Sequence, residues 1–272
     1  MPELPEVETT RRGIAPHVLG ETITNVIVRD RRLRWPVTRN LKKTLTGQQI
    51  RKLDRRGKYL LFYLDRGYLL CHLGMSGSLR ILHQGQPHTK HDHVDICFAS
   101  GSLLRFHDPR RFGALLWFAD DPAYNKLLKH LGPEPLQTEF DGDYLFRSSR
   151  GRTQSIKTLI MDSRIVVGVG NIYANEALFM AGIRPTAKAG KISRKRHWLL
   201  ADSIKHVLNL ALVKGGTTLR DFLNSDGKPG YFRHELAVYD RAGKSCRVCS
   251  QPIQQIRQGQ RSSFYCRVCQ SR

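Results

Sequence analysis

The sequence has few acidic residues, few cysteines and no long apolar run. Of its 272 residues, 23 are Asp or Glu and six are Cys. No stretch of about 20 apolar residues is available for a membrane-spanning helix, and no signal-peptide pattern is present. Because no targeting segment implies an oxidising compartment, a disulfide framework is the weaker interpretation of the cysteines. These absences disfavour both a membrane-embedded and a secreted protein.

Positive charge is what the sequence has in excess. Lys and Arg total 45, which gives a formal net charge of +22. The basic residues recur along the whole chain rather than in one tail, so they predict a folded surface that binds a polyanion such as nucleic acid. An acidic lipid surface is the alternative, but no basic amphipathic helix of the membrane-binding kind is present. We therefore expect a cytoplasmic protein, nucleoid-associated in a bacterium.

The N-terminal part of the chain is predicted to be mostly β-structure. Up to about Trp117, turn residues separate short runs rich in β-branched and aromatic residues, such as ETITNVIVRD, KYLLFYL, YLLCHLGM, HVDICFA and SLLRFHD. Several short strands at close spacing are typical of a sandwich or barrel. One helix is expected ahead of them. Pro5 suits its first turn, acidic residues suit its positive end, and Val7 and Ile14 can face inward.

The rest of the chain, up to the cysteine-rich end, is predicted to be mainly helical. NKLLKHLGPEPL predicts a short helix ended by Gly132 and Pro133. The polar residues 138–152 are expected to form a hinge. Helical patterns return over residues 153–223, and one long helix is predicted from a 3.6-residue apolar period. Its apolar positions are Trp198, Leu199, Ile204, Val207, Leu208, Leu210 and Ala211.

Four cysteines near the C-terminus form a strong metal signal. CRVC at Cys246 and Cys249 is followed by CRVC at Cys266 and Cys269. Two such pairs a hairpin apart can aim four thiolates at one tetrahedral Zn²⁺, which leaves no open position for water or substrate. The zinc would be structural and would fold a segment too small to bury its own core. Two disulfides or free thiols are the weaker alternatives. The turn between the pairs carries arginines that can reach a groove or a phosphate.

Five motifs, in order along the chain, resemble those of one known family. They are MPELPEVET, HLGMSGSLR, DPRRFG, VGVGNIYANEALF and the four-cysteine end with QRSSFYC. Together they resemble formamidopyrimidine-DNA glycosylase, the bacterial base-excision repair enzyme for oxidised purines. The resemblance extends from Pro2 to Cys269. The related endonuclease VIII branch, which prefers oxidised pyrimidines, is less similar, since it typically has Gly at the position of Leu4.

The resemblance implies an α+β multidomain fold. An N-terminal helix and β-sandwich are followed by a hinge, a helical domain with a helix–two-turn–helix element, and a four-cysteine β-hairpin zinc finger. The expected limits are 1–131 for the catalytic domain, 132–152 for the hinge, 153–235 for the helical domain with its lid loop, and 236–272 for the zinc finger. Damaged double-stranded DNA is the implied partner, and one structural Zn²⁺ is the implied cofactor. We expect a monomer with no membrane association.

The resemblance also implies that the N-terminus is reactive. An amine that attacks a sugar carbon can form an iminium ion, and an α-amine titrates roughly two pH units below free lysine, so more of it is unprotonated at neutral pH. Pro2 would attack C1′ of the deoxyribose once Met1 is removed, and Glu3 would move protons as the base leaves. Without the other motifs, Pro2 would be an ordinary terminal residue and Glu3 a solvated one.

Lys58 and Arg261 complete the implied catalytic set. Lys58 would transfer a proton or contact a phosphate during β-elimination, although a lysine at a strand end is most often a solvated residue. Arg261 is linked to δ-elimination. Since arginine stays charged, gripping the phosphate beside the lesion is its physically safer role.

The motifs GMSG and DPRRFG are the implied base-eversion loops. Extruding a base costs about a few kcal/mol of unstacking, which inserted side chains can offset. Met75, Arg110 and Phe112 would form this wedge, with Arg110 bonded to the orphaned cytosine and Phe112 kinking the duplex. Arg111 would contact a phosphate. Core packing is the alternative for Met75 and Phe112, but the flanking glycines and proline predict exposed turns.

Further implied DNA contacts are His91, Arg152, Lys157 and Asn171. Asn171 is expected at the cap of a helix, after glycines that let the backbone approach a phosphate. His91, His93 and Asp95 fall on one strand face and suggest a metal site, but a single strand offers no fourth ligand. His93 and Asp95 are therefore expected to be structural. Residues 217–227 are the implied lid over the everted base.

A zinc-ribbon DNA-binding protein without catalysis is the alternative from another class. The implied catalytic residues argue against it, because a binding protein needs none of that chemistry. The pyrimidine-preferring endonuclease VIII activity is a second alternative, which Leu4 and the complete wedge disfavour.

Overall fold

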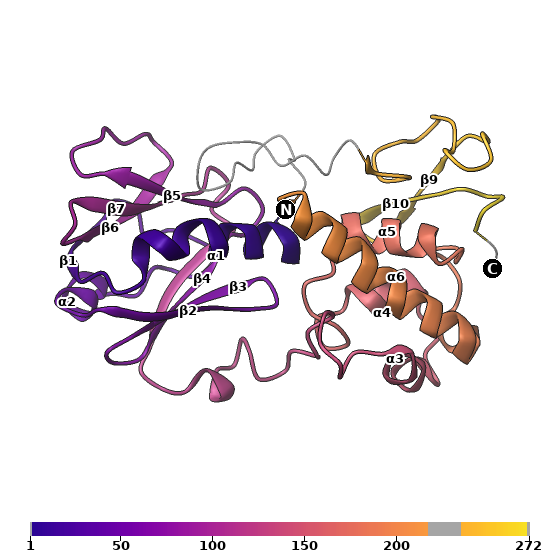
Figure 1. Ribbon diagram of the computed structural model, residues 1–272, viewed down its shortest axis with the longest axis horizontal. Helices are drawn as coiled ribbons and strands as arrows, with labels where there is room; N and C mark the ends of the chain where they lie inside the picture. The colour runs from indigo at the N-terminus through magenta and orange to yellow at the C-terminus, as the bar shows by residue number, and fades with distance from the viewer. Residues whose placement is uncertain (1, 217–234, 271–272) are drawn as a thin grey trace. The chain divides into compact units, whose positions relative to one another are not determined.

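The computed structural model describes residues 2–216 and 235–270. These residues form two compact units (Figure 1). The first contains residues 2–129 and 214–216, and the second contains residues 130–213 and 235–270. Because this division separates neither a hinge nor a zinc finger from the helical part, the domain limits expected from the sequence remain a prediction.

The first unit is built on two four-stranded antiparallel sheets, with strand orders β1–β6–β7–β5 and β2–β3–β4–β8. The strands are β1 (Ile23–Val28), β2 (Ile50–Arg56), β3 (Tyr59–Leu64), β4 (Tyr68–His72), β5 (Ser78–His83), β6 (Asp92–Phe98), β7 (Ser102–His107) and β8 (Ala114–Phe118). Side chains from both sheets, including Phe62, Leu104 and Phe106, share one buried core. The predicted sandwich is therefore confirmed.

Helix α1 (Leu4–Val18) joins this core through its apolar face. Pro5 lies in its first turn, and Val7 and Ile14 are buried, as the sequence predicts. The chain turns after the helix at Gly20, whose φ of +78° is costly for any residue with a side chain. The other short elements of this unit are α2 (Leu41–Leu45) and the 3-10 helix η1 (Pro122–Tyr124).

The second unit is helical and carries one β-hairpin. Its elements are α3 (Gly142–Ser149), α4 (Ile156–Met161), α5 (Asn171–Met180), the 3-10 helix η2 (Ala189–Lys191), α6 (Arg194–Val213), β9 (Gln254–Gln258) and β10 (Arg261–Tyr265). Helix α6 packs against α3 and α5, while α5 also packs against α4 and β10. Within the described residues, no helix has the length and apolarity to cross a membrane.

Two helical predictions differ from the structure. The prediction of a helix before Gly132 is wrong. The carbonyl of Asn125 accepts the N–H groups of Leu128 and Lys129, which closes a single turn, and Gly132 then donates to the Ser163 carbonyl. The expected hinge contains helix α3, whose N-cap Asp141 accepts the Tyr144 N–H at 2.6 Å.

The long apolar helix is confirmed as α6, but two of its predicted core positions are exposed. Trp198 is 40% exposed and Leu199 is 49% exposed. Trp198 lies against the start of α3, where a Cβ on Gly142 would come within 2.3 Å of its ring, and its Nε1 donates to Asp143 Oδ1 at 3.0 Å. The buried face instead includes His197, Leu200 and Ala201.

Candidate active site

The residues at the start of α1 are buried rather than frayed. Pro2 is buried, and Glu3 and Glu6 are each 2% exposed. Glu6 Oε2 accepts the backbone N–H of Glu3 at 2.9 Å, as part of a capping box between these two glutamates. Gly216 lies beside this box, since a Cβ there would be 3.0 Å from Glu6 Oε1. The helix start therefore holds the residue after Met1 in a defined position.

Glu8, one turn further along α1, connects this helix to the hairpin turn that carries Lys58. Its carboxylate contacts Arg11, Arg12 and Arg55 at 2.8, 2.8 and 3.2 Å. Arg55 also donates to the Gly57 carbonyl at 2.9 Å. Lys58 follows Gly57 in the two-residue turn between β2 and β3, so it precedes the strand that the sequence predicts it to begin.

His72 is a site neighbour that the sequence analysis missed. It pairs with Tyr59 across β3 and β4, with the two rings 4.9 Å apart. Burial and the nearby positive charge of Lys58 lower the pKa of His72 to about 4, so its imidazole is neutral at pH 7. Because its Nδ1 accepts the Gly74 N–H at 2.9 Å, the proton lies on Nε2. The sequence signal that could have identified His72 was its position at the start of the motif HLGMSG, which also contains Met75.

The two predicted wedge loops are turns on which the expected side chains are partly or fully exposed. Met75 lies half-buried in the turn between β4 and β5. Arg110 is exposed and Phe112 is 43% exposed, with the Arg110 guanidinium 5.3 Å from the centre of the Phe112 ring. A cationic and an aromatic group therefore share one loop tip.

Arg111, between these two residues, has a different environment. Its φ of +58° is unusual for a residue with a side chain. Its Nη2 lies 2.6 Å from Asp30 Oδ2. The predicted phosphate contact of Arg111 would therefore compete with an ion pair inside the first unit.

The histidines of KHDHVDI have separate surroundings. His91 precedes β6, and its ring lies 6.0 Å from that of His107. Its Nδ1 is buried and has no hydrogen-bond partner among the described residues. His93 Nε2 contacts the Asp108 carbonyl at 2.8 Å, and Asp95 is ion-paired with Arg105 at 2.8 Å. The structural roles expected for His93 and Asp95 are therefore confirmed.

In the second unit, Asn171 is the first residue of α5 and Gly170 is the N-cap, one position earlier than expected. The Asn171 Oδ1 atom is buried and has no partner within the described part of the chain. Four residues later, Asn175 Oδ1 accepts the Phe264 N–H of β10 at 2.8 Å. Asn175 therefore joins α5 to the zinc-finger hairpin, a role that its sequence context does not indicate.

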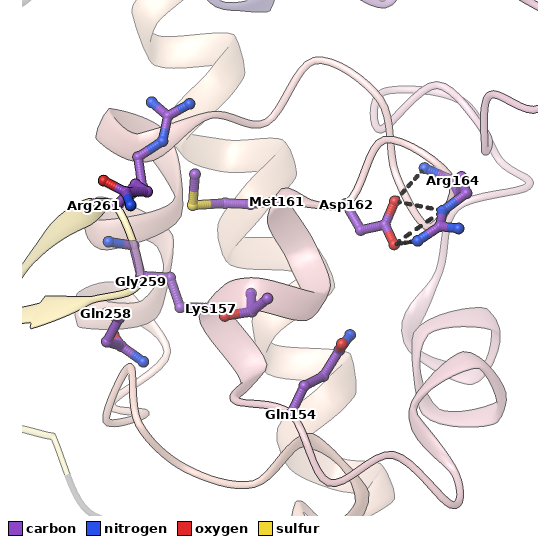
Figure 2. A pocket seen from close by; sticks show the side chains of 10 residues that line it. Gln154, Lys157, Met161, Asp162, Arg164, Gln258, Gly259 and Arg261 are labelled. Carbon is purple, nitrogen blue, oxygen red and sulfur yellow. Dashed lines mark hydrogen bonds and ion pairs between the residues drawn. The ribbon is translucent and has the colours of Figure 1, made fainter.

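Lys157 and Arg261 line one pocket of about 520 Å³ (Figure 2). Lys157 is 2% exposed, and its Nζ donates to the Ser262 carbonyl at 2.8 Å and to Ser263 Oγ at 2.7 Å. Arg261 is exposed at the first position of β10. Asp162 also lines the pocket, bonded to Arg164. Lys157 thus anchors the strand that presents Arg261.

Arg152 and the predicted lid complete the set of expected residues. Arg152 is exposed in the turn after α3. The predicted lid, 217–227, lies outside the described residues. The structure therefore distributes the expected residues over both units. The first unit carries Pro2, Glu3, Lys58, Met75, His91, Arg110, Arg111 and Phe112, and the second carries Arg152, Lys157, Asn171, Arg261 and the four cysteines.

The four cysteines of the CRVC pairs meet at one point. All four Sγ atoms lie within 4.8 Å of one another, with 3.9 Å between Cys246 and Cys269 and 3.3 Å between Cys249 and Cys266. A tetrahedral ZnS₄ site with bonds of about 2.3 Å has S–S edges of about 3.8 Å, so the thiolates fit zinc. They fill all four positions, which makes this zinc site structural.

Glu176 connects this zinc finger to α5. The backbone N–H groups of Ala237, Val238 and Tyr239 donate to its carboxylate at 2.7, 3.0 and 2.8 Å. Burial raises the pKa of Glu176, and the three N–H groups act in the opposite direction. The small cluster of Val238, Cys246, Ile253, Phe264 and Cys266 forms the apolar core of the finger.

Three family models match successive parts of the chain. The formamidopyrimidine-DNA glycosylase N-terminal domain matches residues 1–115, and the formamidopyrimidine-DNA glycosylase H2TH domain matches residues 131–222. A zinc finger found in FPG and IleRS matches residues 243–272.

Relatives and solved structures agree along the full length. Curated formamidopyrimidine-DNA glycosylases of Methylococcus capsulatus and Stutzerimonas stutzeri are 59% and 57% identical over 99% of this chain and 100% of theirs. The crystal structure of the MutM (FPG) protein from Thermus thermophilus has a TM-score of 0.88 at 39% identity, covering 99% of this chain and 98% of that one. A Lactococcus lactis FPG mutant bound to Fapy-dG-containing DNA has a TM-score of 0.93 at 35% identity, with both chains fully covered.

The β-sandwich, the helical unit and the four-thiolate zinc finger together define a DNA-repair enzyme of the helix–two-turn–helix class. The chain belongs to the formamidopyrimidine-DNA glycosylase family. It is a base-excision repair DNA glycosylase, and AP lyase activity is part of that family.

Proposed function

We propose that the chain excises oxidised purines, such as 8-oxoguanine and formamidopyrimidines, from duplex DNA through a Schiff base at Pro2. The observation that carries this proposal is the buried Pro2–Glu3 pair, fixed by the capping box with Glu6. A relative from Lactococcus lactis in complex with Fapy-dG-containing DNA supports the choice of substrate. Another complex of that relative contains an abasic site, which supports the lyase step.

The first chemical step uses the secondary amine that Pro2 exposes when Met1 is removed. Its lone pair forms a bond to C1′, the C1′–base bond breaks, and the bonding electrons leave with the base. Loss of the amine proton then lets the nitrogen expel O4′ as an iminium ion forms. Glu3 protonates O4′ as the ring opens.

The iminium ion acidifies the C2′ proton, so strand cleavage follows by elimination. Loss of this proton expels the 3′ phosphate in the β-step, and a further proton loss expels the 5′ phosphate in the δ-step. Lys58, held in its turn by Arg55, is suited to transfer a proton or bind a flanking phosphate. Arg261, exposed at the hairpin tip, is suited to grip a phosphate because it stays charged.

Base eversion is the proposed role of Met75, Arg110 and Phe112. Their partial or full exposure on two turns supports insertion into the duplex. Further DNA contacts are proposed for His91, Arg111, Arg152, Lys157 and Asn171. In this conformation Lys157 and Arg111 bond within their own units, so a contact with DNA would compete with those bonds.

The zinc finger is proposed to present Arg261 and the rest of the β9–β10 hairpin. Zinc bound by Cys246, Cys249, Cys266 and Cys269 supplies a structural cross-link, and the chain's own amine and carboxylate do the chemistry. We propose that the protein acts as a cytoplasmic monomer on nucleoid DNA, with no membrane association. The net charge of +22 supports a polyanionic partner.

A trapping experiment tests the proposed Schiff base. The mature protein is incubated with an 8-oxoguanine:cytosine duplex and borohydride, and a covalent protein–DNA adduct is expected. A version with a non-removable extension on Met1 has an amide at Pro2 and should form none. A duplex with an oxidised pyrimidine, run in parallel, reports substrate preference. No adduct from the mature protein would reject the mechanism.

A further inference from the structure

Asp108 is a buried acidic side chain that joins the two proposed eversion loops. It is 0% exposed. Its Oδ1 accepts the hydroxyl of Ser76 at 3.0 Å and the backbone N–H of Arg110 at 3.3 Å, while Oδ2 accepts the backbone N–H of Gly113 at 2.8 Å. Ser76 follows Met75, and Arg110 and Gly113 flank the loop that exposes Phe112. One carboxylate therefore contacts both loops.

The backbone of Asp108 is fixed as well. Its N–H donates to the His91 carbonyl at 3.0 Å, and its carbonyl accepts His93 Nε2 at 2.8 Å. His93 is 1% exposed on β6, so the support comes from the sheet below the loops. The backbone of Asp108 is thus bonded to residues at and beside β6, while its carboxylate is bonded to the two loops.

Glycine brings the two loops into direct backbone contact. A Cβ on Gly74, whose φ is +66°, would lie 2.4 Å from the Phe112 carbonyl carbon. A Cβ on Gly113 would lie 2.8 Å from the His72 carbonyl and 3.0 Å from Asp108 Oδ2. No side chain separates the loops at these points, and strands β4 and β8 pair up to His72 and Ala114 at their base. Beyond that pairing, the Asp108 carboxylate bonds to both loops.

We propose that Asp108 is a positioning residue for base eversion: it holds Met75, Arg110 and Phe112 as one rigid wedge. This inference rests on the proposed function. A wedge works only if its side chains keep their place while base stacking resists them, and loops of this size are otherwise soft. Asp108 touches no DNA in this role and acts through the loops.

The chemistry of the three donors explains why the residue must be a carboxylate. An ionised Asp only accepts hydrogen bonds, with lone pairs on both oxygens. In Asp108→Asn one oxygen becomes an NH₂ group. That group then faces either the Gly113 N–H or the Arg110 N–H, and two donors oppose each other. The isosteric change therefore breaks the link without altering side-chain volume.

The test compares two substrates that differ in their need for a wedge. Excision of 8-oxoguanine from a duplex requires unstacking, whereas borohydride trapping on single-stranded abasic DNA does not. We expect Asp108→Asn to slow duplex excision about tenfold, equal to about 1.4 kcal/mol, and to leave trapping within about twofold of the parent protein. Fluorescence of 2-aminopurine beside the lesion should show the same loss of unstacking.

Two serine variants complete the design. Ser76→Ala removes one of the three bonds and should slow duplex excision about threefold, a smaller effect than that of Asp108→Asn. Ser78→Ala changes an equally buried hydroxyl two residues away, 2% exposed on β5, and should change neither assay. If Asp108→Asn does not fold, the duplex excision rate of Ser76→Ala tests the positioning role instead.

The outcomes separate this inference from the proposed function. Unchanged duplex excision in Asp108→Asn, or in Ser76→Ala when it decides, overturns the positioning role. An equal loss on both substrates also overturns it, because it indicates general damage to the fold. If the parent protein itself forms no adduct with either substrate, the proposed function fails instead.

Discussion

Replacing Glu8 with Gln should destabilise the sandwich unit, because this carboxylate neutralises three arginines at once. The side chains of Glu8 and Arg55 are 11% and 13% exposed, and their charged atoms lie 3.2 Å apart. Gln keeps the size of the side chain and one acceptor oxygen but removes the charge. A partly buried guanidinium then loses this opposing charge.

The size of the effect follows from the pKa of Glu8. Although burial alone would raise it, hydrogen bonds and charges from Arg11, Arg12 and Arg55 lower the pKa from 4.5 to about 2. Without any reduction for solvent screening, this lowering of the pKa corresponds to about 3 kcal/mol of folding free energy. Arg12 is 61% exposed, so solvent screening reduces the expected loss to about 1–2 kcal/mol. Each kcal/mol should lower Tm by about 2–4 °C.

The direction of the pH dependence is also fixed. The folded pKa of Glu8 lies below its ordinary value, so its stabilisation is complete above pH 4.5 and disappears as the pH falls through about 2. The parent protein and Glu8→Gln should therefore differ in stability at neutral pH and converge in strong acid.

Thermal unfolding of both proteins at neutral and acidic pH measures this difference. Taking the difference at each pH cancels effects that both share, including zinc release. Glu21→Gln is the matched control, since its carboxylate only accepts the Ser100 N–H at a long 3.4 Å among the bonds described for it. Equal Tm values for parent and Glu8→Gln at pH 7 would refute the reasoning.

Two other predictions concern zinc and DNA affinity. Chelation of zinc should abolish binding to the lesion duplex and amide-exchange protection in β9 and β10, while the sandwich keeps its unfolding transition, because the finger buries few apolar residues of its own. Retained protection after zinc loss would contradict a metal-dependent fold. Duplex affinity should fall about 10³-fold between 50 and 200 mM salt if about six phosphates are neutralised, as measured by fluorescence anisotropy. A flat salt response would contradict the charge-based interpretation.

Local patterns explain what the sequence predicted well. The spacing of the four cysteines was enough to predict their metal site, since each Cys-x-x-Cys turn brings two thiolates together. Strands β3, β4, β6 and β7 were visible as β-branched and aromatic runs. By contrast, β2 has the polar sequence IRKLDRR, which hides its strand pattern. Its Arg51 pairs with Asp65 in the turn after β3, and its Arg55 pairs with Glu8 of α1.

The environment of individual side chains could not be predicted in the same way. Lys157 has the sequence character of a surface phosphate ligand, yet its ammonium group bonds to Ser262 and Ser263, more than 100 positions away. Arg111 is paired with Asp30 from a separate loop. Such partners depend on tertiary structure, which no local pattern records.

Asp108 illustrates a different limit. The motif DPRRFG drew attention to its exposed residues, because Arg and Phe in a turn between a proline and a glycine suggest contact with a ligand. The acid at its start carries no such signal. Its importance became visible through the donors that converge on it from Ser76, Arg110 and Gly113.

The bonds of Glu176 determine where this chain can be shortened. A fragment ending before Ala237 would keep a carboxylate inside the helical unit and remove the three N–H groups that bond it. A fragment beginning at Ala237 would lose the partner of those same groups, together with the Asn175 amide that bonds Phe264. Either cut leaves buried polar groups without their partners, so the zinc finger and α5 must be expressed, transplanted or exchanged together.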